Sequence, residues 1–160
     1  MHRTIFVLSA LLVLPWAVAG AGDAPLDRAT LHGLKAVSVV IDRLPPDLQR
    51  DGLSPERLQR QIEERLAKAG VTIDKDASEF IGFRILSIRE KKAPYSLWFA
   101  IGLYQPVILS RDKNIRTATQ TWEADTVLTA QPKLLARASS VTADQLADQF
   151  IAAWRSVNPQ

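Results

Sequence analysis

Two long alternating segments between residues 95 and 128 constrain this fold more than any other feature of the chain. In both, apolar side chains recur at every second position, which is the pattern of a strand with one buried face. A polar, turn-prone segment over 111–114 separates them. With those four residues as the loop, both apolar sets meet on one face, and Leu103 lies opposite Trp122. A slip of one residue would split the sets, so the sequence predicts one long β-hairpin.

Shorter elements flank the hairpin. Ser54 followed by Pro55 starts the clearest helix, which Gly70 ends. A last helix is predicted to begin at Thr142, where a capping box with Gln145 and a hydrophobic staple coincide. Alternating and β-branched residues predict two further strands. The expected elements before and after the hairpin are a strand over 34–44, a helix over 55–69, a strand over 80–89, and a helix from residue 142.

Two details of these strands bear on the sheet. In the strand over 80–89, Leu86 and Ile88 leave the phase of the residues before them, which indicates a bulge or burial on both faces. Pro106 cannot donate to a central ladder, so the preceding strand is expected to pair only with the part of the hairpin before Gln105. Gly82 and Gly102 stand alone inside strands, where they indicate bulges or a close approach of another group.

The order β-α-β-β-β-α predicts an α+β fold: one four-stranded mixed sheet with two helices mainly on one face. The first strand is parallel to the strand over 80–89 if the two share the sheet. Whether the first strand neighbours the second or the fourth is open. The length suffices for a single domain, placed over residues 34–160, with 20–33 as a flexible lead-in.

The first residues have the form of a secretory signal. A short basic start precedes an uncharged apolar run over 5–14, and Ala17-Val18-Ala19 fits a cleavage site. A retained anchor is the alternative, but the run is short for a membrane span, so residues 1–19 are expected to be removed. The chain has no cysteine, which excludes disulfides and a bacterial lipoprotein anchor. We therefore expect a soluble periplasmic protein without a transmembrane segment after cleavage.

The chemical inventory of the chain is sparse. After the leader, His32 is the one histidine, and no nucleophile motif or phosphate-binding loop is present. The net charge is +3 with acids and bases interspersed, so no basic stripe for nucleic acid is visible. We predict no catalytic, cofactor or metal site, and a protein that is not an enzyme. One alternative is a hydrolase with a dispersed site formed by Glu123, Asp125 and His32; another is a carrier of a small apolar ligand held between sheet and helices.

The aromatic residues are more informative. Trp122 and Trp154 belong to the predicted core sets, whereas Trp98 and Tyr104 fall on the opposite face of the hairpin. Large apolar groups ringed by polar ones indicate an interaction site. The alternative is that a helix or the segment 130–140 covers Trp98. The sequence favours a non-enzymatic periplasmic binding or assembly module that contacts a protein partner or an envelope component, with its oligomeric state open. The candidate contact patch consists of Trp98, Tyr104, Ile108 and Val127.

Scattered short runs carry a resemblance over nearly the whole mature chain. These runs are Gly52-Leu53-Ser54, Ala69-Gly70-Val71, Tyr104-Gln105-Pro106-Val107, Trp122-Glu123 and Ser156-Val157-Asn158-Pro159. They resemble a group of short exported bacterial proteins of proteobacterial type, which implies export and this architecture and supplies no activity. The element order is also similar to the lipopolysaccharide-assembly lipoprotein fold of the outer membrane. This chain departs from that fold by lacking the lipid-bearing cysteine.

Overall fold

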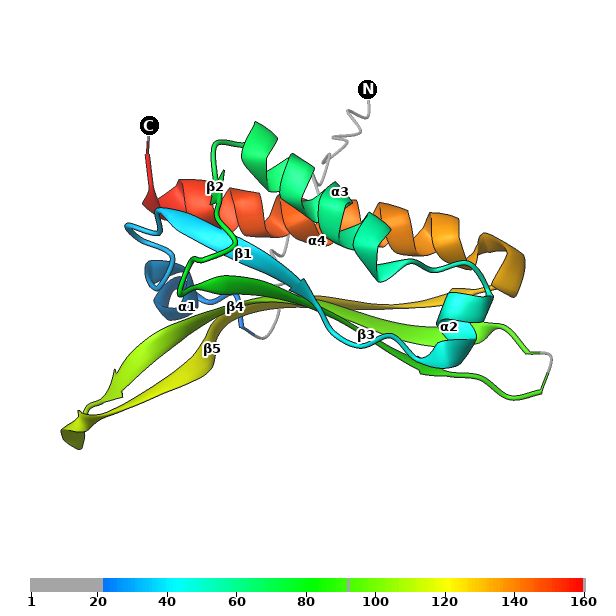
Figure 1. Ribbon diagram of the computed structural model, residues 1–160, viewed down its shortest axis with the longest axis horizontal. Coiled ribbons are helices and arrows are strands. Elements are labelled where there is room, and N and C mark those ends of the chain that lie inside the picture. The colour runs from blue at the N-terminus through cyan, green and yellow to red at the C-terminus, as the bar shows by residue number, and fades with distance from the viewer. Residues whose placement is uncertain (1–21, 92, 160) are drawn as a thin grey trace, which may run out of the picture.

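The computed structural model describes residues 22–91 and 93–159, so the predicted leader over 1–19 lies outside the described residues. The elements follow one another in an order close to the predicted one (Figure 1). They are α1 (Pro25–Ala29), β1 (Ala36–Ile41), α2 (Pro46–Arg50), α3 (Pro55–Lys68), β2 (Thr72–Ile73), β3 (Phe80–Ile88), β4 (Tyr95–Leu109), β5 (Asp112–Ala130), the 3₁₀ helix η1 (Pro132–Leu134) and α4 (Leu135–Val157). No helix in this part of the chain is long and apolar enough to cross a bilayer.

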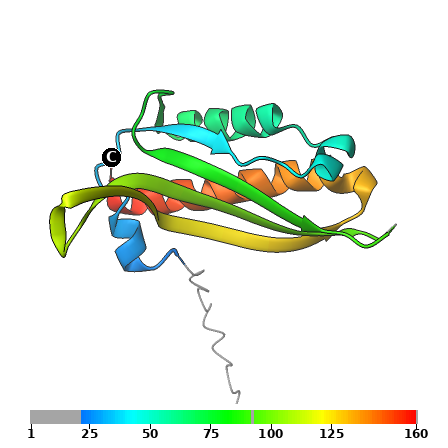
Figure 2. The same ribbon diagram turned by 60° about the horizontal axis from the view of Figure 1, so that its bottom comes forward.

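The strands form one mixed sheet in the order β2-β1-β3-β4-β5. β1 runs parallel to both β2 and β3, and β3, β4 and β5 form an antiparallel meander. Helices α3 and α4 lie side by side on one face of the sheet (Figures 1 and 2). The α+β class and the mixed sheet are confirmed. The predicted number of four strands is wrong, because β2, only two residues long, pairs with the start of β1 at the sheet edge.

The core lies between the sheet and helices α3 and α4. Odd-numbered residues of β4 from Tyr95 to Leu103 point into it, and the even-numbered ones point away. From α4, Phe150 packs edge-on against Trp122 of β5, with ring centroids 5.3 Å apart. Trp122 and Trp154 are both buried, as the sequence predicted. Large apolar residues alternate along these strands because, among the described residues, α3 and α4 cover one face of the sheet (Figure 2).

The inner half of the hairpin has the predicted register, with Leu103 opposite Trp122 and Leu97 opposite Leu128. The outer half is shifted by one residue. Tyr104 pairs with Gln120, so Thr121 is an extra residue, a β-bulge. The predicted loop over 111–114 is wrong, because the chain turns at residues 110–111. As the sequence indicated, β3 pairs with β4 only as far as Tyr104 and leaves Pro106 outside that ladder.

Within the predicted flexible lead-in over 20–33, the described residues 22–33 contain helix α1 and a completely buried Leu31. Residues distant in sequence anchor this segment. Asp23 accepts hydrogen bonds from Arg28, at 2.6 and 2.7 Å, and from the Trp122 indole at 2.7 Å. Asn158, after α4, donates to the Leu31 carbonyl at 2.9 Å. A short helix without an apolar repeat gives little sequence signal, so its docking comes from these tertiary contacts.

Two further helix boundaries differ from the prediction. Pro46 begins the short helix α2, whose Leu48 is fully buried, where the sequence indicated only the end of a strand. Helix α4 begins at Leu135 instead of Thr142, which lies inside the helix and is buried. The capping box at Thr142 is therefore not used. The preceding segment continues from η1 into α4 without a side-chain cap, because its alanines are strong helix formers.

We expect the Asp23 carboxylate to stabilise the fold in a pH-dependent way. Burial raises the pKa of Asp23, but the hydrogen bonds from Arg28 and Trp122 outweigh burial and hold that pKa below its ordinary value of 3.8. A lowered pKa contributes stability that is present above the unfolded-state pKa and is lost as the pH falls through the folded-state pKa. Asp23→Ala should cost about 1.5–3 kcal/mol at neutral pH, measured by urea unfolding.

The difference between wild type and Asp23→Ala should shrink when the same urea titrations are made below the unfolded-state pKa. The matched control is Asp76→Ala, which removes an exposed carboxylate from a turn. If Asp23→Ala and Asp76→Ala lose equal stability at neutral pH, the anchoring of α1 by Asp23 is refuted.

Candidate functional site

The candidate site lies on the sheet face opposite helices α3 and α4, which we call the open face. A cross-strand row runs over it from Leu86 on β3 through Trp98 on β4 to Val127 on β5. Ile88 lies two residues further along β3. Leu86 is 56% exposed, Val127 70% and Ile88 77%. These four residues form what we call the apolar strip, which lines a shallow hollow of about 260 Å³.

Trp98 is the half-buried centre of the apolar strip. Its indole N–H donates to Oδ2 of Asp125 at 2.7 Å. Asp125 lies two residues before Val127 on β5, on the same face. This hydrogen bond satisfies the one polar group of the ring and fixes its orientation. The ring is therefore presented in a defined position beside Leu86 and Val127.

Tyr104 occupies a different part of the open face. Its ring stacks on Phe80, with centroids 4.8 Å apart and planes within 4°. The hydroxyl donates to Oε1 of Gln120 at 2.6 Å and accepts from Arg84 at 3.3 Å. The ring also lies directly over Gly82, where a Cβ would come 2.8 Å from Tyr104. The predicted close approach at Gly82 is thus confirmed, and Tyr104 is held by local contacts.

The four residues of the predicted contact patch are only partly brought together. Trp98 and Val127 are direct cross-strand neighbours. Trp98 and Tyr104 share the open face, but Tyr104 lies six positions further along β4, which places the two Cα atoms about 20 Å apart. Ile108 is 54% exposed and lies further out still, beyond the bulge. The expectation that Trp98 and Tyr104 are neighbours is wrong, because parity places two residues on one face without bringing them close.

Sequence reasoning missed that Leu86 and Ile88 belong to this site. Their break in phase predicts a bulge or burial on both faces, but the ladder between β3 and β4 is continuous and both residues are exposed. Within the described residues, the helices α3 and α4 cover the other face (Figure 2). The segment 130–140, which was expected as an alternative cover for Trp98, instead forms η1 and the start of α4.

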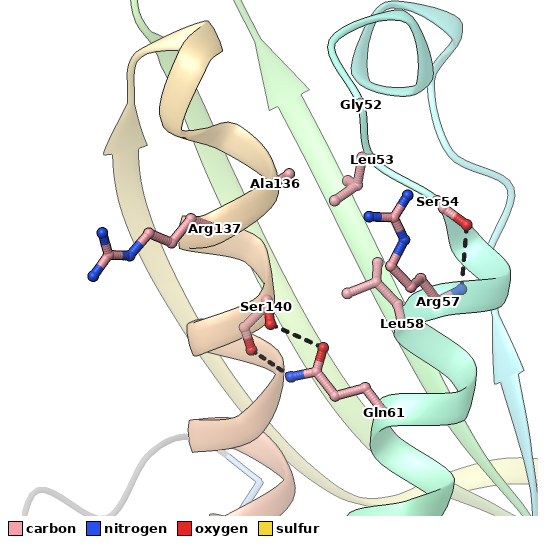
Figure 3. A pocket seen from close by; sticks show the side chains of 9 residues that line it. All are labelled: Gly52, Leu53, Ser54, Arg57, Leu58, Gln61, Ala136, Arg137 and Ser140. Atoms are coloured by element: carbon pink, nitrogen blue, oxygen red, sulfur yellow. Dashed lines mark hydrogen bonds between the residues drawn. The ribbon is translucent and has the colours of Figure 1, made fainter.

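A second hollow, also of about 260 Å³, lies between the first turns of α3 and α4 (Figure 3). Gln61 of α3 and Ser140 of α4 bridge its floor with two hydrogen bonds, both 2.9 Å. Ser54 caps α3 by accepting from the Arg57 amide. Figure 3 shows Arg137 extending to the far side of α4, away from Arg57. The polar groups of this hollow thus hold two helices together, and its two cations do not converge.

The residues of the alternative hydrolase site are dispersed. His32 is exposed on the turn after α1, and Glu123 and Asp125 lie on the open face of β5. The hollow beside Glu123 is lined by Gly22, Asp27 and residues 120–123, and neither His32 nor Asp125 lines it. Among residues 22–91 and 93–159, no group of three or more metal-ligating side chains is placed to hold an ion.

Comparisons with known proteins find distant likenesses alone. No family model matches the chain, and no curated protein matches it significantly. A dodecameric PelC variant from Paraburkholderia phytofirmans is similar with a TM-score of 0.40 and 15% identity, over 76% of this chain and 86% of its own. A minor lipoprotein from Acinetobacter baumannii has a TM-score of 0.35 and 12% identity, over 78% and 93%. These values assign neither a family nor a function, so the resemblance to short exported bacterial proteins stays a prediction.

The packing of Tyr104 over Gly82 is testable by a double-mutant cycle. Alanine normally stabilises a strand relative to glycine by roughly 0.5–1 kcal/mol. Because the added Cβ would clash with the Tyr104 ring, Gly82→Ala should instead cost about 1–3 kcal/mol. The measurement is the free energy of unfolding of Gly82→Ala, Tyr104→Ala and the double variant.

In the Tyr104→Ala background the clash is absent, so Gly82→Ala should be neutral or stabilising there. An equal loss in both backgrounds would show that Gly82 is needed for another reason.

Proposed function

We propose that this protein is a non-enzymatic binding or assembly module of the cell envelope, and that the open face is its contact surface. The observation that supports this most directly is the apolar strip. Three of its four side chains are more than half exposed, and with Trp98 between them the four extend across β3, β4 and β5. Covering such a group removes apolar area from water, which is the main favourable term in protein association.

The surroundings of the strip fit a protein partner. Ser96 and Thr129 border it at one end, and Asp125 and Arg84 lie in the row on its other side. An apolar centre with a polar rim is the usual anatomy of an interface between proteins. Arg84 is itself paired with Asp42 at 2.7 Å, so the rim carries few charges that a partner would have to neutralise.

The proposed location is the periplasm. It depends on the sequence pattern of residues 1–19, whose removal would leave a chain that starts close to α1. The described fold begins at Gly22, whose carbonyl accepts a hydrogen bond from the Glu123 amide at 3.0 Å.

The proposal predicts opposite phenotypes for two tryptophans of the hairpin. Trp98→Ala should weaken partner binding by about 2 kcal/mol or more, the size typical of a central interface tryptophan, while changing the melting temperature little. Trp122→Ala should lower stability by about 3–5 kcal/mol, because it empties the core position against Phe150. The measurements are thermal unfolding of both variants and crosslinking in intact cells of the native host, with each variant expressed with its own leader.

The matched surface control is Thr117→Ala, an exposed strand position away from the apolar strip. It should leave both crosslinked adducts and melting temperature unchanged. Unfolding of Trp98→Ala as severe as that of Trp122→Ala would assign Trp98 to the core. Retention of every adduct in a folded Trp98→Ala would exclude the strip as the contact surface.

A further inference from the structure

The outer edge of β5 is an unpaired strand edge with a defined set of outward-pointing groups. β5 is the last strand of the sheet, so one side pairs with β4 and the other faces outward. The Glu123 amide donates to the Gly22 carbonyl on that outer side. Since backbone groups alternate between the two edges of a strand, the N–H and C=O groups of Asp125, Val127 and Thr129 also point outward. Among the described residues, none forms a backbone hydrogen bond with this part of the edge.

This edge lacks the usual protection against strand pairing. Natural edges are blocked by lysine, proline, bulges or a covering segment. Residues 124–130 contain no lysine, arginine or proline and are rich in threonine and β-formers, and both irregularities of the β4–β5 ladder lie before them on β5. The one acidic group, Asp125, is turned toward the Trp98 indole. Among residues 22–91 and 93–159, the one backbone hydrogen bond to this edge is that of Gly22 at Glu123, and 124–130 receive none.

We infer that a second copy of this chain pairs with β5 along this edge, antiparallel, with the two-fold axis at Val127. In that register Val127 faces its own counterpart, and Asp125 faces Thr129 of the second copy. Each of these residues both donates and accepts a backbone hydrogen bond, as in any edge-to-edge strand addition. The contact uses the strand edge and leaves the open face accessible, so it goes beyond the proposed function.

Among the registers centred on an outward-pointing residue, the side chains favour this one, and its self-complementarity indicates a second copy as the occupant. Centring the axis on Asp125 would set two carboxylates opposite each other and drive the second copy into Gly22. Centring it on Thr129 would lose most pairs, because β5 ends at Ala130 and Pro132 follows. The register at Val127 opposes no like charges and joins the two apolar strips into one, with Val127 at the seam. A surface that is complementary to itself about one axis is the condition for a two-fold dimer.

The absence of cysteine makes the register directly testable by single-cysteine crosslinking. Directly paired residues in an antiparallel ladder have Cα atoms about 5.5 Å apart, within disulfide range. With a mild added oxidant, Val127→Cys should therefore form covalent dimers with itself. Asp125→Cys alone and Thr129→Cys alone should not, because each lies about 14 Å from its own counterpart. A mixture of Asp125→Cys and Thr129→Cys should crosslink.

The matched experiment measures the molar mass of the cysteine-free protein, expressed with its own leader, over a range of concentrations. Wild type should be a dimer and Val127→Lys a monomer with an unchanged melting temperature. Thr117→Lys, which adds the same charge to an exposed position elsewhere on β4–β5, should remain a dimer. Trp98→Ala should keep the Val127→Cys crosslink, which separates this contact from partner binding by the open face.

Three outcomes would overturn the inference. The first is a wild type that is monomeric at every concentration. The second is a crosslink of Asp125→Cys with itself as efficient as that of Val127→Cys, which would indicate random collision. The third is hydrogen-exchange protection of the amides of residues 125, 127 and 129 that is as strong in the monomeric Val127→Lys variant as in the wild type, which would assign the edge to a segment of the same chain.

Discussion

The cross-strand pairing of Leu103 with Trp122 determines which side of the sheet is buried. Since side chains on a strand alternate between two faces, this single register assigns the residues in the inner halves of β4 and β5 either to the core or to the open face. The same parity carries over to β3 through its continuous ladder with β4. Phe150 of α4 packs on Trp122, and Asp23 binds its indole, so the helical layer and the N-terminal segment are also positioned by it.

The bulge at Thr121 limits this register to the inner half of the hairpin. Beyond it the strands lie outside the helical layer and are largely exposed (Figure 1). Gln105, next to the shift, donates to the Thr121 hydroxyl at 2.7 Å, which holds the extra residue in place. The inner halves of β4 and β5 thus belong to the buried sheet, and their outer halves form a projecting two-stranded arm. A two-stranded hairpin has little stability of its own in water.

The elements that could be predicted from the sequence are those in which apolar residues repeat at regular intervals over many residues. The hairpin core, β3 and α3 repeat their apolar residues over several turns or pleats, and the structure has them where the pattern indicated. α1, α2 and β2 are too short to repeat anything. The run Thr117-Ala118-Thr119-Gln120-Thr121 reads equally well in two registers, so the bulge left no trace in the pattern. At α4 a good capping box misled the prediction, because alanine-rich segments form helix without it.

Much the same holds for the candidate site. Parity alone placed Trp98 and Val127 on the open face, and the structure has them in contact across the ladder. Tyr104 was grouped with them although strand geometry separates it from Trp98 by about 20 Å, a distance that follows from residue spacing. Leu86 and Ile88 were visible as a phase break, but only the sheet order shows that they adjoin Trp98. Which backbone groups of β5 point outward is shown by the hydrogen bond from Glu123 to Gly22, which no side-chain pattern encodes.

The anchoring of α1 has a kinetic consequence. Its contacts join Asp23 to Trp122 and Leu31 to Asn158, across separations of 99 and 127 residues. Such contacts close long loops, and they can form only after the sheet and α4 are in place. We therefore expect helix α1 to dock last during folding and to detach first during unfolding. The two ends of the fold are thus joined by contacts that we expect to form after the rest of the structure.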